Sequence, residues 1–216
     1  MHHNLQLKNS LLSRFIAELR GIEIQKDRMR FRKNMERIGE IFAYEISQTL
    51  QYHAEDVETP MGLASVQTCG DRLVIANILR AGIPMHYGVL NYFDQADNAF
   101  VSAYRMHHKD GSFEINLQYV SCPDLNDAVL IICDPMLATG ASMDISLQNL
   151  LEYGTPKQVH IVTAIASTPG LDHIRRVYPK AHIWTGAVDE ELTAKSFIVP
   201  GLGDAGDLSF GPKVQD

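Results

Sequence analysis

The amino-acid sequence predicts an α/β protein with a central, mainly parallel sheet flanked by helices. From residue 72 onward, short apolar runs of strand length alternate with stretches of helical character, and such alternation is typical of sheets joined by right-handed crossovers. Several runs are rich in Val and Ile along their whole length, as in strands buried on both faces of a parallel sheet. With 216 residues, 45% of them apolar, the chain can form one sizeable core.

We interpret residues 1–216 as one domain, in which an N-terminal arm and helix (residues 1–70) precede an α/β core (residues 71–216). A helix is predicted over residues 26–51, because apolar side chains recur along one face at Phe31, Met35, Ile38, Phe42 and Ile46. The Lys and Arg residues of its first turns could contact a phosphate or form a solvated face. Residues 52–70 have no sustained period and predict an irregular or short-strand connection.

The remaining elements follow in chain order. Strands are predicted at residues 73–79, 99–104, 128–133, 158–165 and 181–187, with helices at residues 84–93, 143–153 and 171–178. The span from His107 to Tyr119 holds the turn dipeptide Asp110-Gly111 between strand-like residues, which indicates a hairpin or flap. Ligands of such sheets bind beyond the carboxyl ends of the strands, so the residues just after each run are functional candidates.

Composition narrows the possible function classes. The formal charge of −7 argues against a nucleic-acid-binding protein, since phosphate backbones usually bind a positive face. No apolar run approaches the roughly 18 to 20 residues of a membrane span, and residues 1–20 lack the features of a secretory signal. Three cysteines without paired spacing indicate neither a disulfide framework nor a zinc site. We therefore expect a cytoplasmic protein without a membrane partner.

The most informative segment runs from Val129 to Ser142. An apolar strand ends in Asp134, and a loop of small residues then opens a helix. Backbone N–H groups at a helix N-terminus can bind an anion, which the helix dipole also favours. Thr139 and Ser142 can add hydroxyl donors, and Asp134 can accept from sugar hydroxyls or approach a metal-bound substrate. The spacing fits neither a Walker loop nor a dinucleotide loop, and an ordinary capped helix is the competing interpretation.

This segment resembles the phosphoribosyl pyrophosphate loop of the type I phosphoribosyltransferases, in the form found in uracil phosphoribosyltransferases. The matching stretches are Ile78-Leu79-Arg80-Ala81-Gly82, Tyr104-Arg105, Asp134-Pro135-Met136-Leu137-Ala138-Thr139-Gly140 and Ile198-Val199-Pro200-Gly201-Leu202-Gly203-Asp204-Ala205-Gly206-Asp207. The resemblance covers about residues 20–212. It implies the type I phosphoribosyltransferase fold, with an N-terminal helical arm and a β-hairpin flap.

The resemblance also implies roles for individual residues. Arg80 and Arg105 would bind the pyrophosphate and Asp134 a ribose hydroxyl, which makes these three the catalytic candidates. The other contacts to phosphoribosyl pyrophosphate would come from Pro135, Met136, Leu137, Ala138, Thr139, Gly140, Ala141, Ser142 and Asp204. Uracil would be lined by Ile198, Gly203, Asp204 and Ala205. Mg²⁺ would arrive bound to the substrate, without a metal site formed by the protein.

The residues and the resemblance indicate the same chemistry. Displacing pyrophosphate from a ribose carbon requires anion clamps more than a nucleophilic side chain. We predict a glycosyltransferase of pyrimidine salvage that transfers the phosphoribosyl group of 5-phosphoribosyl 1-pyrophosphate to N1 of uracil, giving UMP and pyrophosphate. The long amphipathic helix and the resemblance suggest a homodimer or higher oligomer. The alternatives are an RNA-binding regulator of pyrimidine operons on the same scaffold, transfer to a purine, and an inactive nucleotide sensor.

Several positions depart from the usual family pattern, including residues 141 and 197. Ala141 stands where a second glycine is common, and Phe197 stands where tyrosine is common. The methyl group restricts the loop slightly, and the missing hydroxyl removes one possible donor near the base. Near the C-terminus, Phe210 is expected to pack in the core beneath the glycine-rich segment.

Overall fold

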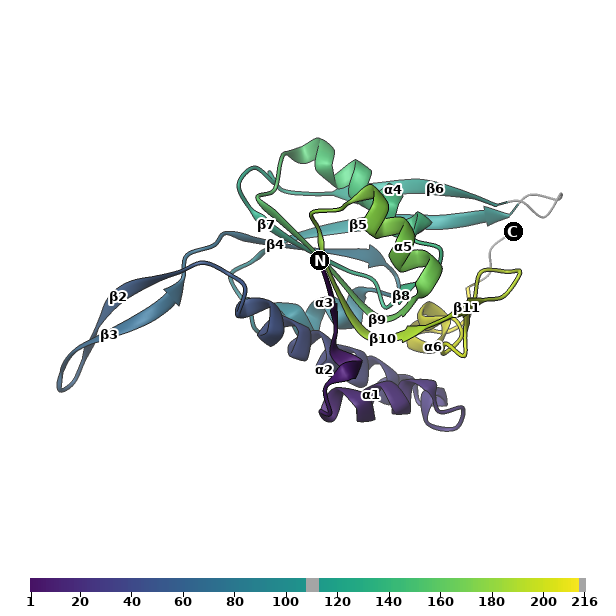
Figure 1. Ribbon diagram of the computed structural model, residues 1–216, viewed down its shortest axis with the longest axis horizontal. Helices are drawn as coiled ribbons and strands as arrows, with labels where there is room; N and C mark the ends of the chain where they lie inside the picture. Colours follow the sequence, from purple (N-terminus) through teal and green to yellow (C-terminus); the bar gives the residue numbers. More distant parts are fainter. Residues whose placement is uncertain (108–112, 214–216) are drawn as a thin grey trace.

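A sheet forms the centre of the protein, with helices on both of its faces (Figure 1). The computed structural model describes residues 1–107 and 113–213, together with their side chains except those of residues 103–118. The strands of the sheet are β1 (His2–Asn4), β4 (Leu73–Leu79), β5 (Asp97–His107), β6 (Phe113–Ser121), β7 (Val129–Cys133), β8 (Met136–Leu137), β9 (Gln158–Ser167) and β10 (His182–Asp189). The helices are α1 (Leu11–Arg20), α2 (Arg28–Ser47), α3 (Ile83–Leu90), α4 (Ala141–Leu150), α5 (Thr168–Val177) and α6 (Ala205–Phe210).

The strand order is β1-β10-β9-β7-β4-β5-β6, with β8 paired to β9. The pairs along this order are parallel apart from the antiparallel pair β5–β6. From β4 the chain continues outward to β5, whereas from β7 it continues in the other direction to β9 and β10. The topological switch point therefore lies between β4 and β7, where ligands of doubly wound sheets bind. The predicted fold class is confirmed.

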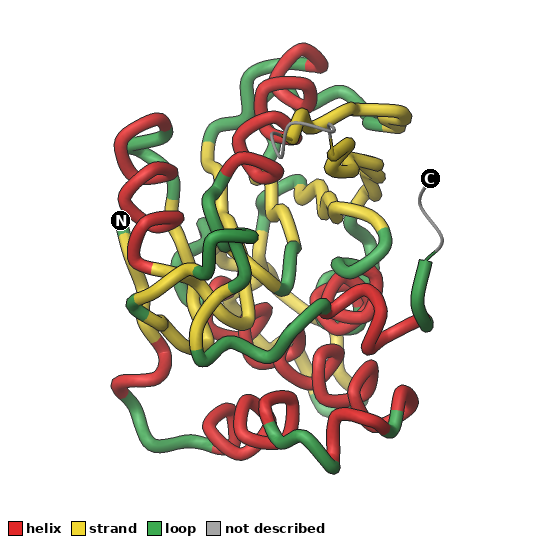
Figure 2. Tube along the Cα trace, turned by 90° about the vertical axis from the view of Figure 1, so that its right-hand side faces the viewer, coloured by secondary structure: helices red, strands yellow, loops and turns green. Residues whose placement is uncertain are grey.

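Helices lie on both sides of the central strands (Figure 2), and alternate residues of these strands pack into two cores, one on each side of the sheet. Ile75 on β4 and Ile131 on β7 pack into the core that contains the apolar faces of α1, α2 and α3. Ala76 and Ile132, one residue further along each strand, pack into the core that contains α4 and α5. Because both faces are buried, these strands show continuous apolar runs rather than an alternating pattern.

Helix α2 buries the predicted apolar face. It is shorter than predicted at both ends. It ends at Ser47, and it begins after Asp27, whose carboxylate accepts from the backbone N–H of Arg30 at 3.1 Å. Each apolar side chain of the predicted face is at most 1% exposed. On the basic side, Arg32 donates to the carbonyl of Ser209 at 2.7 Å, and Lys33 pairs with Glu36 at 2.9 Å. These two cations are therefore held by neighbouring protein groups.

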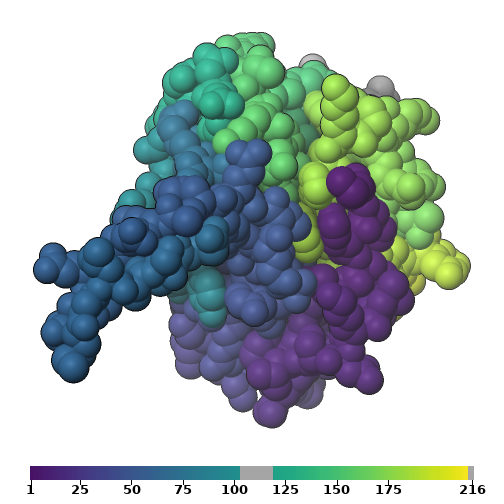
Figure 3. Space-filling model, turned by 60° about the vertical axis from the view of Figure 1, so that its left-hand side comes forward, coloured from purple at the N-terminus to yellow at the C-terminus, as the bar shows by residue number. Residues whose placement is uncertain are grey.

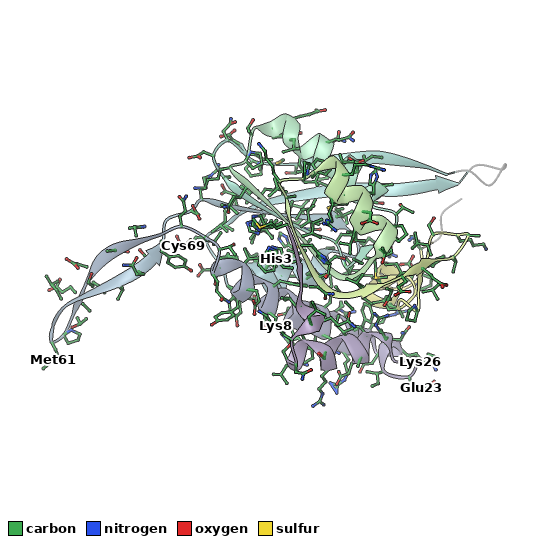
Figure 4. The ribbon with its side chains drawn as sticks, in the orientation of Figure 1. His3, Lys8, Glu23, Lys26, Met61 and Cys69 are labelled. Atoms are coloured by element: carbon green, nitrogen blue, oxygen red, sulfur yellow. The ribbon has the colours of Figure 1, made fainter. Side chains whose placement is uncertain are left out.

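Residues 52–70 differ from the irregular or short-strand connection that the sequence predicts. They form a long hairpin of β2 (Tyr52–Thr59) and β3 (Gly62–Cys69), paired from Tyr52 opposite Cys69 to Thr59 opposite Gly62. The hairpin projects from the body of the protein (Figures 1 and 3), with Met61 at its tip and Cys69 at its base (Figure 4). Both of its faces are largely exposed, so no buried face gives the sequence a strand period.

The predicted hairpin over residues 107–119 coincides with the antiparallel pair β5–β6. Its Asp110-Gly111 turn lies outside the described residues. A second small pair, β11 (Glu191–Leu192) with β12 (Ile198–Val199), precedes α6. Within the described residues, no helix combines the length and apolar character needed to cross a membrane.

Candidate active site

The loops that follow β4 and β7 meet at the switch point of the sheet. Arg80 comes directly after β4, and Asp134 comes directly after β7. Gly82 makes this close approach possible, because a Cβ atom there would lie 2.6 Å from the carbonyl oxygen of Cys133. The structure therefore brings together two of the sequence-predicted catalytic residues, each at the carboxyl end of a central strand.

The loop after Asp134 forms a hollow at the N-terminus of α4. Gly140 precedes the helix with a φ of 83°, a left-handed conformation that favours glycine. No side chain caps α4 from this position, and the hydroxyl of Thr139 accepts from the backbone N–H of Ala141 at 3.3 Å. The hollow is shallow and partly open to solvent, and it is lined by Asp134, Met136, Leu137, Ala138, Thr139, Gly140, Ser142 and Met143.

Most of the predicted loop residues thus line this hollow, and two do not. Pro135 and Ala141 do not line the hollow; the carbonyl of Pro135 instead accepts from Ile165 of β9 at 3.0 Å. Met143, which does line it, was not predicted. A hollow with a helix N-terminus and hydroxyl side chains at its wall suits a phosphate group.

Two residues of the β9–α5 junction support this loop from behind. The hydroxyl of Ser167 donates to the carbonyl of Ala138 and accepts from the backbone N–H of Gly170, which caps α5. A Cβ atom at Gly170 would lie 2.2 Å from the same Ala138 oxygen. Sequence analysis missed both residues, although the Ser-Thr-Pro-Gly start of a helix is a recognisable capping signal.

Arg80 links the strand end to the C-terminal segment. Its guanidinium donates to a carboxylate oxygen of Asp207 at 2.8 Å and to the carbonyl of Gly211 at 3.2 Å. The side chain stays 38% exposed, so it remains accessible to an anionic ligand. Arg105 lies on β5 opposite Ile115 of β6, but its side chain lies outside the described residues.

Asp204 acts as the N-cap of α6. Its carboxylate accepts from the backbone N–H of Asp207 at 2.9 Å and from the ammonium group of Lys213 at 3.3 Å. Partial burial raises the pKa of Asp204, but the hydrogen bond from Asp207 and the charge of Lys213 outweigh this effect and hold the pKa below its usual value. Asp204 is therefore anionic near neutral pH.

The predicted uracil-lining residues lie on β12 and around the start of α6. Ile198 and Ala205 are 5% and 4% exposed and belong to the same core, and Gly203 has a φ of 99°. None of them lines the hollow above the phosphate loop. Phe210 differs from its expected core position, since it is 39% exposed and its ring lies 6.0 Å from the guanidinium of Arg32.

An ion pair holds this C-terminal segment in place, and sequence analysis did not identify it. Arg20 at the end of α1 makes two hydrogen bonds to Asp189 at the end of β10, at 2.7 and 2.8 Å. Arg20 also donates to the carbonyl of Gly201 at 2.9 Å, and the backbone N–H of Gly201 donates to Asp189 at 2.9 Å. The N-terminal helix thus holds the loop that precedes Gly203.

The fold and the site together define a phosphoribosyltransferase of type I. The features that define it are a doubly wound α/β sheet, a glycine turn that opens a helix at the switch point, an arginine directly after the neighbouring strand and a glycine-rich C-terminal segment. Comparisons with known proteins identify the branch. The family model for uracil phosphoribosyltransferase matches residues 6–212. The chain therefore belongs to the uracil phosphoribosyltransferase family.

Individual relatives agree with this assignment. A uracil phosphoribosyltransferase from Porphyromonas gingivalis is 50% identical, with 98% of each chain covered. One from Methanothermobacter thermautotrophicus is 40% identical and covers 84% of this chain and 83% of its own length. Among solved structures, the AQ2163 protein from Aquifex aeolicus matches over 100% of both chains, with a TM-score of 0.88 and 29% identity.

Proposed function

We propose that the protein transfers the phosphoribosyl group of 5-phosphoribosyl 1-pyrophosphate to N1 of uracil, giving UMP and pyrophosphate. The observation that carries the proposal is the open hollow at the N-terminus of α4, beside the carboxylate of Asp134. In a chain of this family, the hollow suits the 5-phosphate of the sugar. Asp134, at the end of β7, is suited to accept a hydrogen bond from a ribose hydroxyl.

Catalysis in this proposal depends on stabilising charge. As the bond from the anomeric carbon to pyrophosphate lengthens, positive charge develops on the ribose and negative charge on the leaving group. Arg80 leaves its contact with Asp207 and binds the pyrophosphate, and Arg105 is the second candidate for this role. The C–O bond to pyrophosphate breaks, the bond to N1 of uracil forms, and the proton on N1 leaves to solvent.

Mg²⁺ enters the proposal as part of the substrate. Among the described residues, no three His, Cys, Asp or Glu side chains gather as a metal site. Mg²⁺ usually keeps several waters and binds substrate phosphates with few protein ligands, and we propose an ion that pyrophosphate carries. When bound, the ion neutralises charge on the leaving group.

In this proposal, uracil binds against the C-terminal segment. Ile198 and Ala205 are apolar, and Gly203 has no side chain, so the backbone here can approach a flat base closely. Main-chain N–H and C=O groups can then pair with the polar edge of a pyrimidine. Asp204, which is anionic near neutral pH, suits the ribose hydroxyls more than the phosphates.

We further propose that the protein is a homo-oligomer in the cytoplasm and that the β2–β3 hairpin makes the subunit contact. Met61 and Leu63 at its end are 96% and 75% exposed, and isolated two-stranded hairpins are marginally stable in water. A second copy of the chain would cover these apolar side chains. Light scattering should give at least a dimer for the wild type and a smaller species for the double variant M61D/L63D, whereas equal masses would refute the contact.

A direct test incubates the purified protein with uracil, phosphoribosyl pyrophosphate and Mg²⁺ and measures UMP by chromatography. Asp134→Asn and Arg80→Ala should lower kcat by about 100-fold or more, as expected when a charge-stabilising group is lost. Asp97→Asn and Arg72→Ala are the matched controls, because this pair, 2.9 Å apart, lies at the opposite end of the sheet. Absence of UMP with the wild type, or equal losses in all four variants, would refute the proposal.

A further inference from the structure

A network of side chains lies behind the phosphate-binding turn, between α4 and α5. Asp144 is in the first turn of α4, and its carboxylate accepts from His173 of α5 at 2.9 Å. The same carboxylate accepts from the hydroxyl of Tyr178 and from the side-chain amide of Gln148, at 2.9 and 2.8 Å. Asp144 is therefore held on the side of α4 that faces α5.

His173 contacts the turn as well as the helix. A Cβ atom at Gly140 would lie 2.9 Å from Cδ2 of His173, so the imidazole ring is packed directly against the left-handed residue of the turn. The guanidinium of Arg176 lies 3.3 Å from Nδ1 of His173. Because a guanidinium can only donate, this contact assigns the lone pair to Nδ1 and the proton to Nε2, which donates to Asp144.

The network also reduces the repulsion between the Asp144 carboxylate and the proposed phosphate. A carboxylate in the first turn of α4 lies close to the place proposed for the 5-phosphate, where two negative charges would repel each other. Burial raises the pKa of Asp144, but hydrogen bonds from Tyr178, His173 and Gln148 outweigh it and hold the pKa below its usual value. The carboxylate is thus charged. The donors that surround it hold it on the side of α4 that faces α5 and partly offset its negative charge.

We propose that His173 and Asp144 are positioning residues for the phosphate-binding turn. His173 packs against Gly140 and is tied to Asp144, so together they fix the backbone N–H groups of the turn in the orientation that binds the phosphate. The inference rests on the proposed function, since it assumes that the hollow receives the phosphate of phosphoribosyl pyrophosphate. It requires that losing this network weakens binding of that substrate and leaves uracil binding unchanged.

Steady-state kinetics with both substrates provides the test. His173→Ala should raise KM for phosphoribosyl pyrophosphate about tenfold, the effect of losing roughly one hydrogen bond to a charged group. KM for uracil and kcat should stay within about twofold of the wild type. His173→Gln retains an N–H donor for Asp144 and should recover most of the substrate affinity. Asp172→Ala is the matched control, because this exposed residue is on the same helix.

Ribose 5-phosphate gives a second readout that needs no turnover. It should raise the melting temperature of the wild type and of Asp172→Ala, and raise that of His173→Ala less at the same concentration. Equal effects of His173→Ala on the KM of both substrates, or the same loss in Asp172→Ala, would overturn the inference. An inactive wild type would instead refute the proposed function, so the two failures are distinguishable.

Discussion

Acid should destabilise this protein through a buried histidine on an interior strand of the sheet. His160 of β9 is fully buried beside His182 and Trp184 of β10. Its Nδ1 accepts from the indole N–H of Trp184 at 3.0 Å, and its Nε2 lies 3.3 Å from the side-chain oxygen of Gln158. Protonation of Nδ1 would break the bond to Trp184. Burial, followed by the charges of His182 and His3, lowers the pKa of His160 from 6.5 to about 3.

The sign and the magnitude follow from linkage. Since the folded pKa lies below the unfolded one, the unfolded chain takes up more protons, and stability falls as pH drops below 6.5. One such group lowers the free energy of unfolding by about 1.4 kcal/mol per pH unit below pH 6.5. The free energy of unfolding should therefore fall by about 2 kcal/mol from pH 7 to pH 5. The loss continues until the pH reaches the folded value of about 3.

Urea unfolding at fixed protein concentration measures this effect, with fluorescence of Trp184, the single tryptophan, as the probe. His160→Asn keeps an acceptor for Trp184 but removes the titrating group, so its stability should depend less on pH by about 2 kcal/mol over the same range. His53→Asn, on the exposed hairpin, should keep the wild-type dependence. Equal pH dependence in the wild type and His160→Asn would refute the reasoning.

Three other predictions follow from close contacts. Gly170→Ala places a Cβ atom 2.2 Å from the Ala138 oxygen, and should lower kcat/KM for phosphoribosyl pyrophosphate about tenfold in steady-state assays; an unchanged value would contradict a supporting role. Arg20→Ala leaves the buried carboxylate of Asp189 without its cation and should lower the free energy of unfolding, measured in urea, by about 3 kcal/mol. A decrease below about 1 kcal/mol would show that the ion pair is dispensable. A brief maleimide pulse at pH 8 should label Cys69 alone by mass spectrometry, because that thiol is exposed and burial raises the pKa of the other two thiols; equal labelling of all three would contradict the burial.

The central strands could be predicted well from the sequence because both of their faces are buried. The run at residues 73–79 coincides with β4, and the run at 128–133 differs from β7 by one residue. Both strands are covered on both faces, so an unbroken apolar run is their direct consequence. The β2–β3 hairpin is the opposite case. It contacts water on both faces, and neither periodicity nor composition distinguishes it from a loop.

The turn that we propose to bind phosphate could also be located from the sequence, because its features are local. Asp134, the small loop residues and the start of α4 are consecutive in sequence, and backbone N–H groups at a helix N-terminus are suited to an anion. The residues that orient the turn are not local. Ser167, Gly170 and His173 lie about 30 residues further along the chain, and their approach to the loop depends on how α5 packs beside α4.

The C-terminal segment depends even more on distant partners. Arg20 is 169 residues from Asp189 and 181 residues from Gly201 in sequence, yet it bonds to both. Because these bonds hold the loop before Gly203, changes at Arg20 should alter uracil binding more than phosphate binding. Changes at His173 should do the reverse, since that side chain packs against Gly140. We therefore expect binding of the two substrates to respond to changes on opposite faces of one sheet, uracil to α1 on one face and the phosphate to α5 on the other.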